Sequence, residues 1–418
     1  MTTDELARLE REFEEEARAE GLKKFQARLQ ELADDAPSKG SDGKPLTKVR
    51  MIGMNIQTVM GKARIMVKCG KCKTTGEYET PFRLNFFRAE RAAMSPELEQ
   101  RVVITTCETG SFEKASVLCK RWGCEISDDK IMDTIARVGN ACHDEQLPRR
   151  CDHAAGKKDT LIIMMDGWFA RHREKKWGKK RAPMEERVAW REIKSAVIYK
   201  LSQVATVSRE RRMLITKHIV AMPAETDPVE FGKEVKKEAI RMGMLEAETI
   251  YVIIDGGLYL WNIYEDRFSN IAKARLDYYH ATVHLQALAE AIFEKEQSEE
   301  KEKWVKRLRR NLKVWGPNTL MEELEKAREL QVDDPERVET IRQESAYFRK
   351  HESHMNYRED RKEGVPIGSG SVESLCSQLQ DRFKRTGQFW SYKGLDAFLK
   401  VYTRYKNDEL QYCYKKSA

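Results

Sequence analysis

The sequence predicts an α/β protein whose main domain contains a mixed β-sheet covered by helices. The apolar run 161–165 leads directly into Asp166, and a second apolar run, 250–254, leads into Asp255. Short apolar runs bounded by polar or turn residues are typical of strands buried inside a sheet. Between residues 285 and 362 the pattern is almost wholly helical, with charges of both signs. This stretch is too long for a loop and predicts an all-helical insertion.

The amino-terminal part predicts two small modules. Within residues 1–45, apolar residues recur at helical spacing up to Ala33, and the Gly-, Ser- and Pro-containing stretch 34–45 follows as a linker. Residues 46–92 contain short β-prone segments around Cys69 and Cys72, which have the spacing of metal ligands. A structural zinc ion needs four ligands and no second CxxC pair follows, so a zinc site and two plain thiols in a turn both remain open.

Residues 93–150 predict a helical module. Three helical stretches follow one another, and the first and the last begin at the Ser caps Ser95 and Ser127. This order resembles a helix-turn-helix unit, whose last helix can enter a DNA major groove. The last helix is poor in Arg, Lys, Asn and Gln, so a helical packing module is the equal alternative.

The main domain, 155–418, has the order of elements of a ribonuclease-H-like fold. Three predicted strands, a helix, two more strands and a final helix that carries Glu373 follow one another, with the insertion between the last strand and that helix. Acids at the ends of parallel strands can converge, because the strands end at one edge of the sheet. "GSGSVES" gives a flexible loop and a helix start near Ser371, so we expect Glu373 in the first helical turn.

Charge and composition restrict the class of protein. The 418 residues include 76 Lys and Arg against 68 Asp and Glu, a net charge of +8. The positive charges cluster in 171–181 and 301–315, and both runs contain Trp. A solvated charged face is the commoner explanation of either run alone, and nucleic-acid binding is the alternative. The absence of a long apolar run or signal-peptide core predicts a cytoplasmic, nucleoid-associated protein without membrane contact, and nine cysteines then predict reduced thiols.

At these residues the sequence resembles the DDE transposases of bacterial insertion sequences, in particular the Kra-type and Lre-type groups. The resemblance covers most of the chain beyond residue 50. It rests on motifs that follow one another in the family's order: Asp166-Gly167, Glu192-Ile193-Lys194, Asp255-Gly256 with Trp261-Asn262, Asp277 to Ala281, Gly368 to Ser374, and Arg382, Lys384, Arg385, Gly387 and Trp390. In place of the basic residue that the family more often has before this Trp, the chain has Phe389.

The resemblance implies a catalytic triad of Asp166, Asp255 and Glu373. Three acids without a Ser or Cys nucleophile suit phosphoryl transfer assisted by two Mg²⁺ or Mn²⁺ ions, which bind carboxylate oxygens. We assign Asp166 as the bridging ligand, Asp255 as a ligand of one ion and Glu373 as a ligand of the other. One Asp-Gly pair alone would more often be a turn, but two such pairs with the "GSGSVES" acid favour a site.

Further site residues are predicted with alternatives left open. Asp277 and His280 are secondary candidates, as a ligand and a phosphate- or water-positioning group, although an Asp that caps the following helix is the slightly favoured alternative. The segment 382–390 either contacts DNA, with Trp390 stacking on an unpaired base, or packs as a surface helix end. The predicted DNA contacts are Arg171, Arg173, Lys175, Lys176, Lys306, Arg307, Arg309, Arg310, Arg382, Lys384, Arg385 and Trp390.

The predicted function is a transposase that binds the terminal repeats of its element and target DNA, and that cleaves and joins strands as a homo-oligomer. A ribonuclease-H-like nuclease or resolvase that only hydrolyses would share the acids without needing the additional modules. A domesticated DNA-binding protein would keep the modules and could lose an acid. A zinc-dependent regulator would rest on Cys69 and Cys72 alone.

Overall fold

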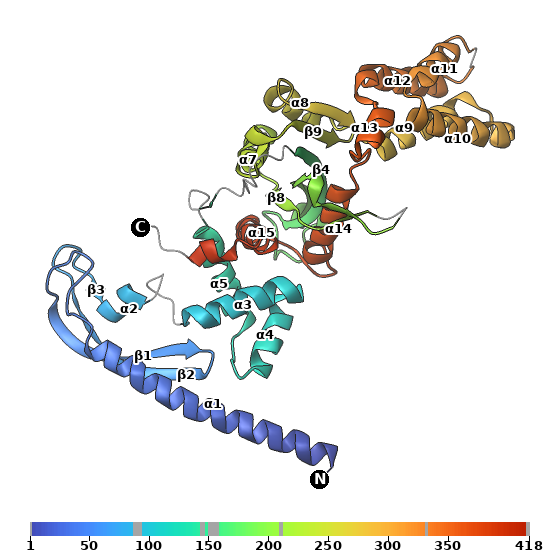
Figure 1. Ribbon diagram of the computed structural model, residues 1–418. Coiled ribbons are helices and arrows are strands. Elements are labelled where there is room, and N and C mark those ends of the chain that lie inside the picture. The colour runs from blue at the N-terminus through green and yellow to red at the C-terminus, as the bar shows by residue number, and fades with distance from the viewer. Residues whose placement is uncertain are drawn as a thin grey trace. The chain divides into compact units, whose positions relative to one another are not determined.

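The computed structural model describes residues 2–86, 94–142, 147–148, 159–208, 212–330 and 333–414 (Figure 1). The chain forms two compact units, Met1–Ala141 with Tyr414–Ala418, and Cys142–Cys413. The module boundaries predicted at 92–93 and at 150–155 lie outside the described residues. The first unit therefore contains all three predicted amino-terminal modules up to residue 141.

The first unit begins with a long helix on a small antiparallel sheet. Helix α1 (Thr3–Asp34) starts at a capping box in which Thr2 and Glu5 exchange hydrogen bonds. It packs on β2 (Gly61–Lys71), which pairs with β1 (Thr47–Thr58) and β3 (Tyr78–Glu79). Alternate strand residues point to the helix, and the core contains Met54, Ile56, Ile65, Val67 and Ala33.

Four helices complete this unit as the structure describes it. The short α2 (Pro81–Phe86) follows the sheet. Helices α3 (Pro96–Thr109), α4 (Phe112–Arg121) and α5 (Asp128–Asn140) pack on one another. Each of these three begins at a serine whose hydroxyl accepts a backbone N–H, namely Ser95, Ser111 and Ser127.

The second unit is built on a mixed five-stranded sheet, as predicted. Its strand order is β10-β9-β4-β5-β8, with β4 (Thr160–Arg173), β5 (Val188–Lys200), β8 (His218–Met222), β9 (Thr249–Ile254) and β10 (Lys273–Leu276). Strands β4, β9 and β10 are parallel, whereas β5 is antiparallel to both β4 and β8. A separate small hairpin consists of β6 (Val204–Thr206) and β7 (Arg212–Leu214).

Helices cover both faces of this sheet (Figure 1). On one face, α7 (Pro228–Arg241) and α8 (Leu258–Arg267) pack against Leu161, Ile163 and Met165 of β4. On the other, α14 (Gly370–Phe383) packs on β4 and β5, and α15 (Tyr392–Lys406) packs on β8. The short α6 (Met184–Arg187) lies in the β4–β5 connection, and 3-10 turns occupy Leu201–Gln203, Met244–Glu246, Lys295–Gln297, Glu352–His354 and Leu410–Tyr414.

Among the described residues, five helices lie between β10 and α14, and the predicted insertion, 285–362, begins within the first of them. They are α9 (Tyr278–Ile292), α10 (Ser298–Val314), α11 (Asn318–Arg328), α12 (Pro335–Lys350) and α13 (Tyr357–Glu363). Leu285 of α9 and Leu308 of α10 belong to the same buried cluster as Met165 of the sheet. The insertion is therefore joined to the sheet by a continuous core.

The oxidation state of the cysteines differs in part from the prediction, which was that all thiols are reduced. Cys142 and Cys413 form a disulfide. Of the other cysteines that the structure describes, Cys69, Cys72, Cys107, Cys119, Cys124 and Cys376 are free and buried. None of the described helices is long and apolar enough to cross a membrane.

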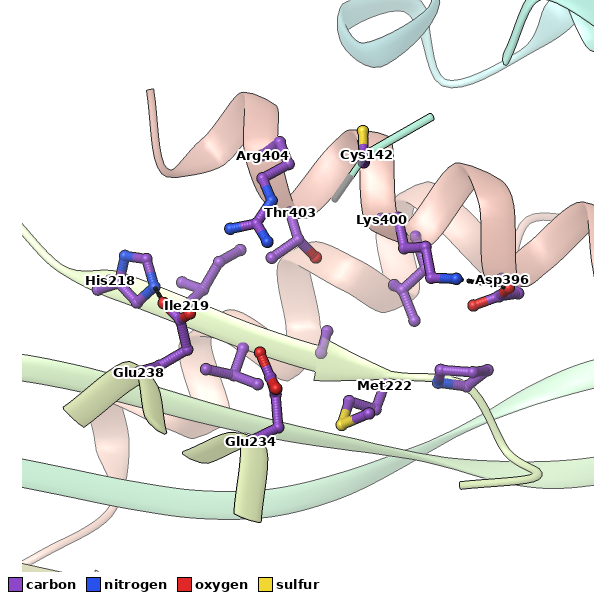
Figure 2. Close-up of a pocket in the computed structure, with 14 residues that line it drawn as sticks. Cys142, His218, Ile219, Met222, Glu234, Glu238, Asp396, Lys400, Thr403 and Arg404 are labelled. Carbon is purple, nitrogen blue, oxygen red and sulfur yellow. Dashed lines mark hydrogen bonds and ion pairs between the residues drawn. The ribbon is translucent and has the colours of Figure 1, made fainter. Parts of the chain in front are cut away.

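A cavity of about 280 Å³ lies between β8, α7 and α15 (Figure 2). Beside it, Glu238 Oε2 lies 2.5 Å from His218 Nε2 and accepts a hydrogen bond of 2.6 Å from Arg241 Nη2. Burial raises the pKa of Glu238, but the hydrogen bonds from His218 and Arg241 outweigh it and lower this pKa to about 2. The Glu238 carboxylate therefore stabilises the contact between β8 and α7.

We expect Glu238→Gln to lower the free energy of unfolding by roughly 3 kcal/mol at pH 7. The folded pKa lies below the ordinary value, so the contribution of Glu238 is present above about pH 4.5 and is lost as the pH falls toward 2. Urea unfolding at pH 7 and pH 3 measures both effects. Glu230→Gln removes an exposed partner of Lys233 on the same helix and should cost under ~1 kcal/mol. Equal losses in the two variants would contradict this role of Glu238.

Candidate functional site

Asp166 and Asp255 lie next to each other where the pairing of β4 with β9 ends. The last parallel pair joins Met165 to Ile254, and the two acids follow directly. Asp166 does not end its strand, in contrast to the prediction, because β5 continues to pair with β4 as far as Arg173. The two carboxylates thus stand at a step in the sheet, where β9 stops and β4 continues.

Helix α14 brings Glu373 to this step. The register of β4 turns Asp166 to the face that α14 covers. Burial raises the pKa of Asp166, and the charges of Asp255 and Glu373 raise it further. Hydrogen bonds from the Gly167 amide, at 2.7 Å, and from the Cys376 thiol act in the opposite direction. Asp255 and Glu373 are therefore both close enough to Asp166 for their charges to act on it.

Hydrogen bonds of Asp255 hold the loop after β9, and the insertion packs closely against this loop at Gly256. Asp255 Oδ1 accepts a hydrogen bond of 2.8 Å from the Gly257 amide, and the Asp255 carbonyl accepts one of 2.8 Å from the Trp261 indole. A Cβ on Gly256 would lie 2.8 Å from the Tyr347 ring and 3.2 Å from His280 Nε2. Residue 256 must therefore be glycine for the insertion to approach the Asp255 loop this closely.

Asp277 connects helix α9 to the loop that carries Glu373. Its side chain is 1% exposed, and its oxygens accept hydrogen bonds from the amides of His280, at 2.7 Å, and Ser369. Ser369 Oγ in turn donates a hydrogen bond of 2.6 Å to Glu373 Oε1. These contacts favour the helix-cap alternative for Asp277, because both carboxylate oxygens already hold backbone amides.

We expect Asp277→Ala to destabilise the protein by about 2–4 kcal/mol. The change removes a helix cap and leaves the buried Ser369 amide without its acceptor. Thermal or urea unfolding measures the loss. Asp227→Ala removes the exposed cap of α7, which accepts from Val229 at 2.7 Å, and should cost only ~1 kcal/mol. If the two variants lost the same stability, Asp277 would be an ordinary cap with no effect on the Ser369 loop.

A chain of polar side chains leads from the insertion to the Asp255 loop. His280 Nε2 lies 3.2 Å from His284 Nε2, and His284 Nδ1 lies 2.8 Å from Glu344 of α12. The His284 ring stacks on Tyr347 with centroids 3.8 Å apart. Burial raises the pKa of the Tyr347 hydroxyl, and the charge of Asp255 adds to this. Sequence reasoning missed His284, Glu344 and Tyr347, because they carry no motif and lie within a generic helical pattern.

Glu192 is another acid near the site to which the sequence assigned no role. Tyr259 donates a hydrogen bond of 3.0 Å to Glu192 Oε1, and a Cβ on Gly167 would lie 2.1 Å from that oxygen. Gly167 therefore leaves room for the carboxylate. Burial and then the Glu192 charge raise the pKa of the Tyr259 hydroxyl. The strand register places Glu192 on the face of β4 and β5 opposite to Asp166.

The donor set at the step suits a hard divalent cation. Carboxylate oxygens are the ligands that Mg²⁺ and Mn²⁺ prefer. In the described part of the chain, no three His, Cys, Asp or Glu side chains are gathered as a ready-made metal cage. Mg²⁺ usually takes one or two protein carboxylates, with water and substrate phosphate as its other ligands. Cys69 and Cys72 are buried and belong to no such group among the described residues, and the choice between a zinc site and two plain thiols stays a prediction.

The predicted DNA-contacting residues fall into exposed and buried sets. The exposed set includes Arg173, Lys175, Lys176, Lys306, Arg307, Arg309, Arg310, Lys384 and Arg385, and Arg171 is partly exposed. Lys176 forms an ion pair with Glu186, and Arg307 forms one with Glu323 at 3.3 Å. For the other residues of the exposed set, and for Arg171, contact with DNA stays a prediction.

Arg382 and Trp390 are buried, which contradicts the DNA contacts predicted for them. Trp390 is 8% exposed, and its indole donates a hydrogen bond of 2.8 Å to the Phe383 carbonyl. The Arg382 guanidinium lies 4.1 Å from the centroid of the Phe398 ring. Both side chains pack between α14 and α15, so the packing alternative holds for them.

Helix α5, the last helix of the helix-turn-helix-like module, has an acidic exposed face. Asp128, Asp129 and Asp133 are exposed, whereas Ile131, Thr134 and Ile135 are buried. Negative charges oppose an approach to DNA phosphates. This distribution favours the packing alternative for α5.

Comparisons with known proteins find a family model that matches part of the chain and a solved structure that is similar to it. The model of an uncharacterised protein family, UPF0236, matches residues 237–412, which include Asp255 and Glu373 but not Asp166. Among solved structures, the chain is similar to the Drosophila P element transposase strand transfer complex, with 12% identity over 76% of this chain and 79% of that chain. The TM-score is 0.23, which is too low to indicate a common fold. No curated protein matches the sequence.

Proposed function

We propose that the chain is a DDE-type transposase that cleaves and joins DNA strands at the ends of its element. The convergence of Asp166, Asp255 and Glu373 at the step in the sheet carries this proposal, because Glu373 lies far from both aspartates in sequence. The motifs that resemble DDE transposases contain the same three acids. An isolated structural acid would not need two further carboxylates within electrostatic reach.

In the proposed reaction, Asp166, Asp255 and Glu373 would hold two Mg²⁺ or Mn²⁺ ions. The ions would supply activation of the attacking oxygen and stabilisation of the leaving one. The Asp277–Ser369 contact fixes the start of α14, and Ser369 in turn holds Glu373, whose charge acts on Asp166. His280, held by His284 and Glu344, lies beside the Asp255 loop and orients a phosphate oxygen or water there.

The proposed substrates are the terminal repeats of the element and a target duplex. Lys306 and Arg310 on α10, and Lys175 and Arg173 near the β4–β5 hairpin, supply exposed positive charge for phosphates. The enzyme must join two DNA ends, so we propose that it acts as a homo-oligomer on DNA.

Incubation of the full-length protein with labelled element-end DNA and Mg²⁺ tests this function. The DNA on either side of the coding region, searched for terminal inverted repeats, provides the substrate. We expect nicks at the repeat boundary, followed by joining of the new 3′ ends to a target plasmid. Hydrolysis without joining would instead identify a nuclease or resolvase, and specific binding without any cleavage would identify a DNA-binding protein.

A further inference from the structure

A patch of exposed and partly exposed aromatic and basic side chains lies on the outer part of the β4–β5 pair. It consists of Phe169 and Arg171 on β4, Trp190 on β5, and Lys384 and Phe389 after α14; we refer to these five residues as the Trp190 platform. Arg171 and Trp190 are direct partners in the register, and Phe169 lies two residues along the same face. Trp190 is 51% exposed, whereas tryptophan is on average highly buried.

Positive charges surround the aromatic rings of the platform. The Arg171 guanidinium carbon lies 5.6 Å from the centroid of Trp190 and 4.8 Å from that of Phe389. Lys384 Nζ lies 5.0 Å from the Trp190 centroid. Just beyond, the Arg173 guanidinium carbon lies 5.0 Å from the centroid of Trp177. Cations and aromatic rings therefore alternate along this surface.

The platform is held rigidly by the buried Trp390. The Trp390 amide donates a hydrogen bond of 2.9 Å to the Arg171 carbonyl, and the Arg173 amide donates one of 2.8 Å to the Trp390 carbonyl. The Arg173 side chain also donates to the Phe389 carbonyl at 2.8 Å. The segment that carries Phe389 is thus fixed along the edge of β4 beyond the end of β9. A rigid aromatic surface loses little entropy when it binds a ligand.

We propose that the Trp190 platform binds an unpaired nucleic-acid strand, with bases stacked on Trp190 and Phe389 and phosphates held by Arg171 and Lys384. Aromatic rings interleaved with cations are the features that bind single strands without sequence preference. A protein segment would use the apolar rings but would need acidic groups placed against Arg171 and Lys384. A duplex exposes no base faces to the rings, so an unpaired strand fits the observed side chains better.

The platform stands at a fixed distance from the three acids. Five residues of β4 separate Asp166 from Arg171, which is roughly 16 Å along a strand. Eleven residues separate Glu373 from Lys384, also roughly 16 Å along a helix. Because the five-residue separation on β4 is odd, Arg171 and the rest of the platform on β4 stand on the opposite face of the strand from Asp166, and the platform is a binding surface separate from the three acids. The assignment of the bound strand to the opened end of an element rests on the proposed function, whereas the binding of a single strand does not.

Fluorescence anisotropy of labelled oligo(dT) with the full-length protein tests this proposal. Stacking contributes about 1–3 kcal/mol per base, so we expect Trp190→Ala to weaken oligo(dT) binding by roughly 5- to 150-fold, with Trp190→Phe restoring most of the affinity. The slope of log affinity against log salt should stay unchanged in Trp190→Ala. Lys384→Gln should reduce that slope by ~0.7, the value for one contact to a single strand.

Phe13→Ala is the matched control. Phe13 is 64% exposed but stands among glutamates on α1, where no phosphate is expected to bind. Oligo(dT) binding by Trp190→Ala at the affinity of Phe13→Ala would overturn the proposal, as would an equal loss of affinity for a blunt duplex of the same length. Asp166→Asn should bind oligo(dT) normally. A protein that binds oligo(dT) through Trp190 but never cuts DNA would contradict the proposed transposase function. It would not contradict the binding of a single strand by the Trp190 platform.

Discussion

Asp166→Asn is expected to reduce Mg²⁺-dependent nicking of element-end DNA by on the order of 10³-fold or more. The side chain of Asn has the same shape but lacks the charge that a bridging ligand needs, and such a ligand supplies several kcal/mol of transition-state stabilisation. Asp255→Asn should have a similar effect. A time course of nicking on a labelled oligonucleotide measures both variants. Wild-type rates in Asp166→Asn would remove this residue from the catalytic site.

The same substitution should leave the fold intact and can stabilise it in metal-free buffer. Burial and the nearby Asp255 and Glu373 raise the folded pKa of Asp166 above its ordinary value. The wild-type protein therefore loses stability as the pH rises from about 3.8 through the folded pKa, because ionisation is easier in the unfolded chain. Asn cannot ionise, so we expect a Tm at pH 7 equal to or above that of the wild type. DNA binding should also persist, since the basic surfaces are unchanged.

Glu373→Gln is expected to abolish cleavage and joining to a similar extent while DNA-end binding remains. Gln can still accept the hydrogen bond from Ser369 Oγ, so the change removes charge and preserves the local structure. Asp381→Asn is the matched control, because it neutralises an exposed acid on the same helix about 12 Å away. Cleavage and strand transfer, measured separately on precut and uncut ends, should fall only in Glu373→Gln.

Strand transfer by Glu373→Gln at the wild-type rate would mean that another acid supplies the third ligand. Glu192 is the next acid to test, because it lies close to Gly167 and Tyr259. Its position on the opposite face of the sheet makes it a poorer partner for Asp166. Glu192→Gln therefore distinguishes the two arrangements: it should leave cleavage nearly unchanged if Glu373 is the ligand.

The sequence predicted the mixed sheet and its neighbouring aspartates because apolar runs of five residues report burial directly. Asp166 and Asp255 follow such runs, and parallel pairing then aligns them. The sequence did not reveal that β4 continues past Asp166, since residues 168–173 are three apolar residues followed by three basic ones and lack the polar-apolar alternation of a half-exposed strand, although their side chains alternate between buried and more exposed against β5. Pairing partners decide where a strand ends, and they lie elsewhere in the chain.

The aromatic residues were harder to assign from the sequence. Trp390 and Trp190 both stand near basic residues, yet one is buried and the other half-exposed. Periodicity does not distinguish them, because the difference arises from the packing of α14 and α15 around Phe383 and Phe398. The contacts of His284 with Glu344 and Tyr347 likewise depend on how α9 and α12 pack, which no local pattern encodes.

The position of Glu373 on α14, after the five inserted helices, affects how the protein behaves during its synthesis. The ribosome makes Asp166 and Asp255 long before α14, and until that helix docks, Ile162, Met164 and Trp168 of β4 lack part of their cover. A nascent or truncated chain therefore has neither the third acid nor a completed core. Under the proposed function, DNA cleavage should therefore be detectable only in products whose translation has passed α14.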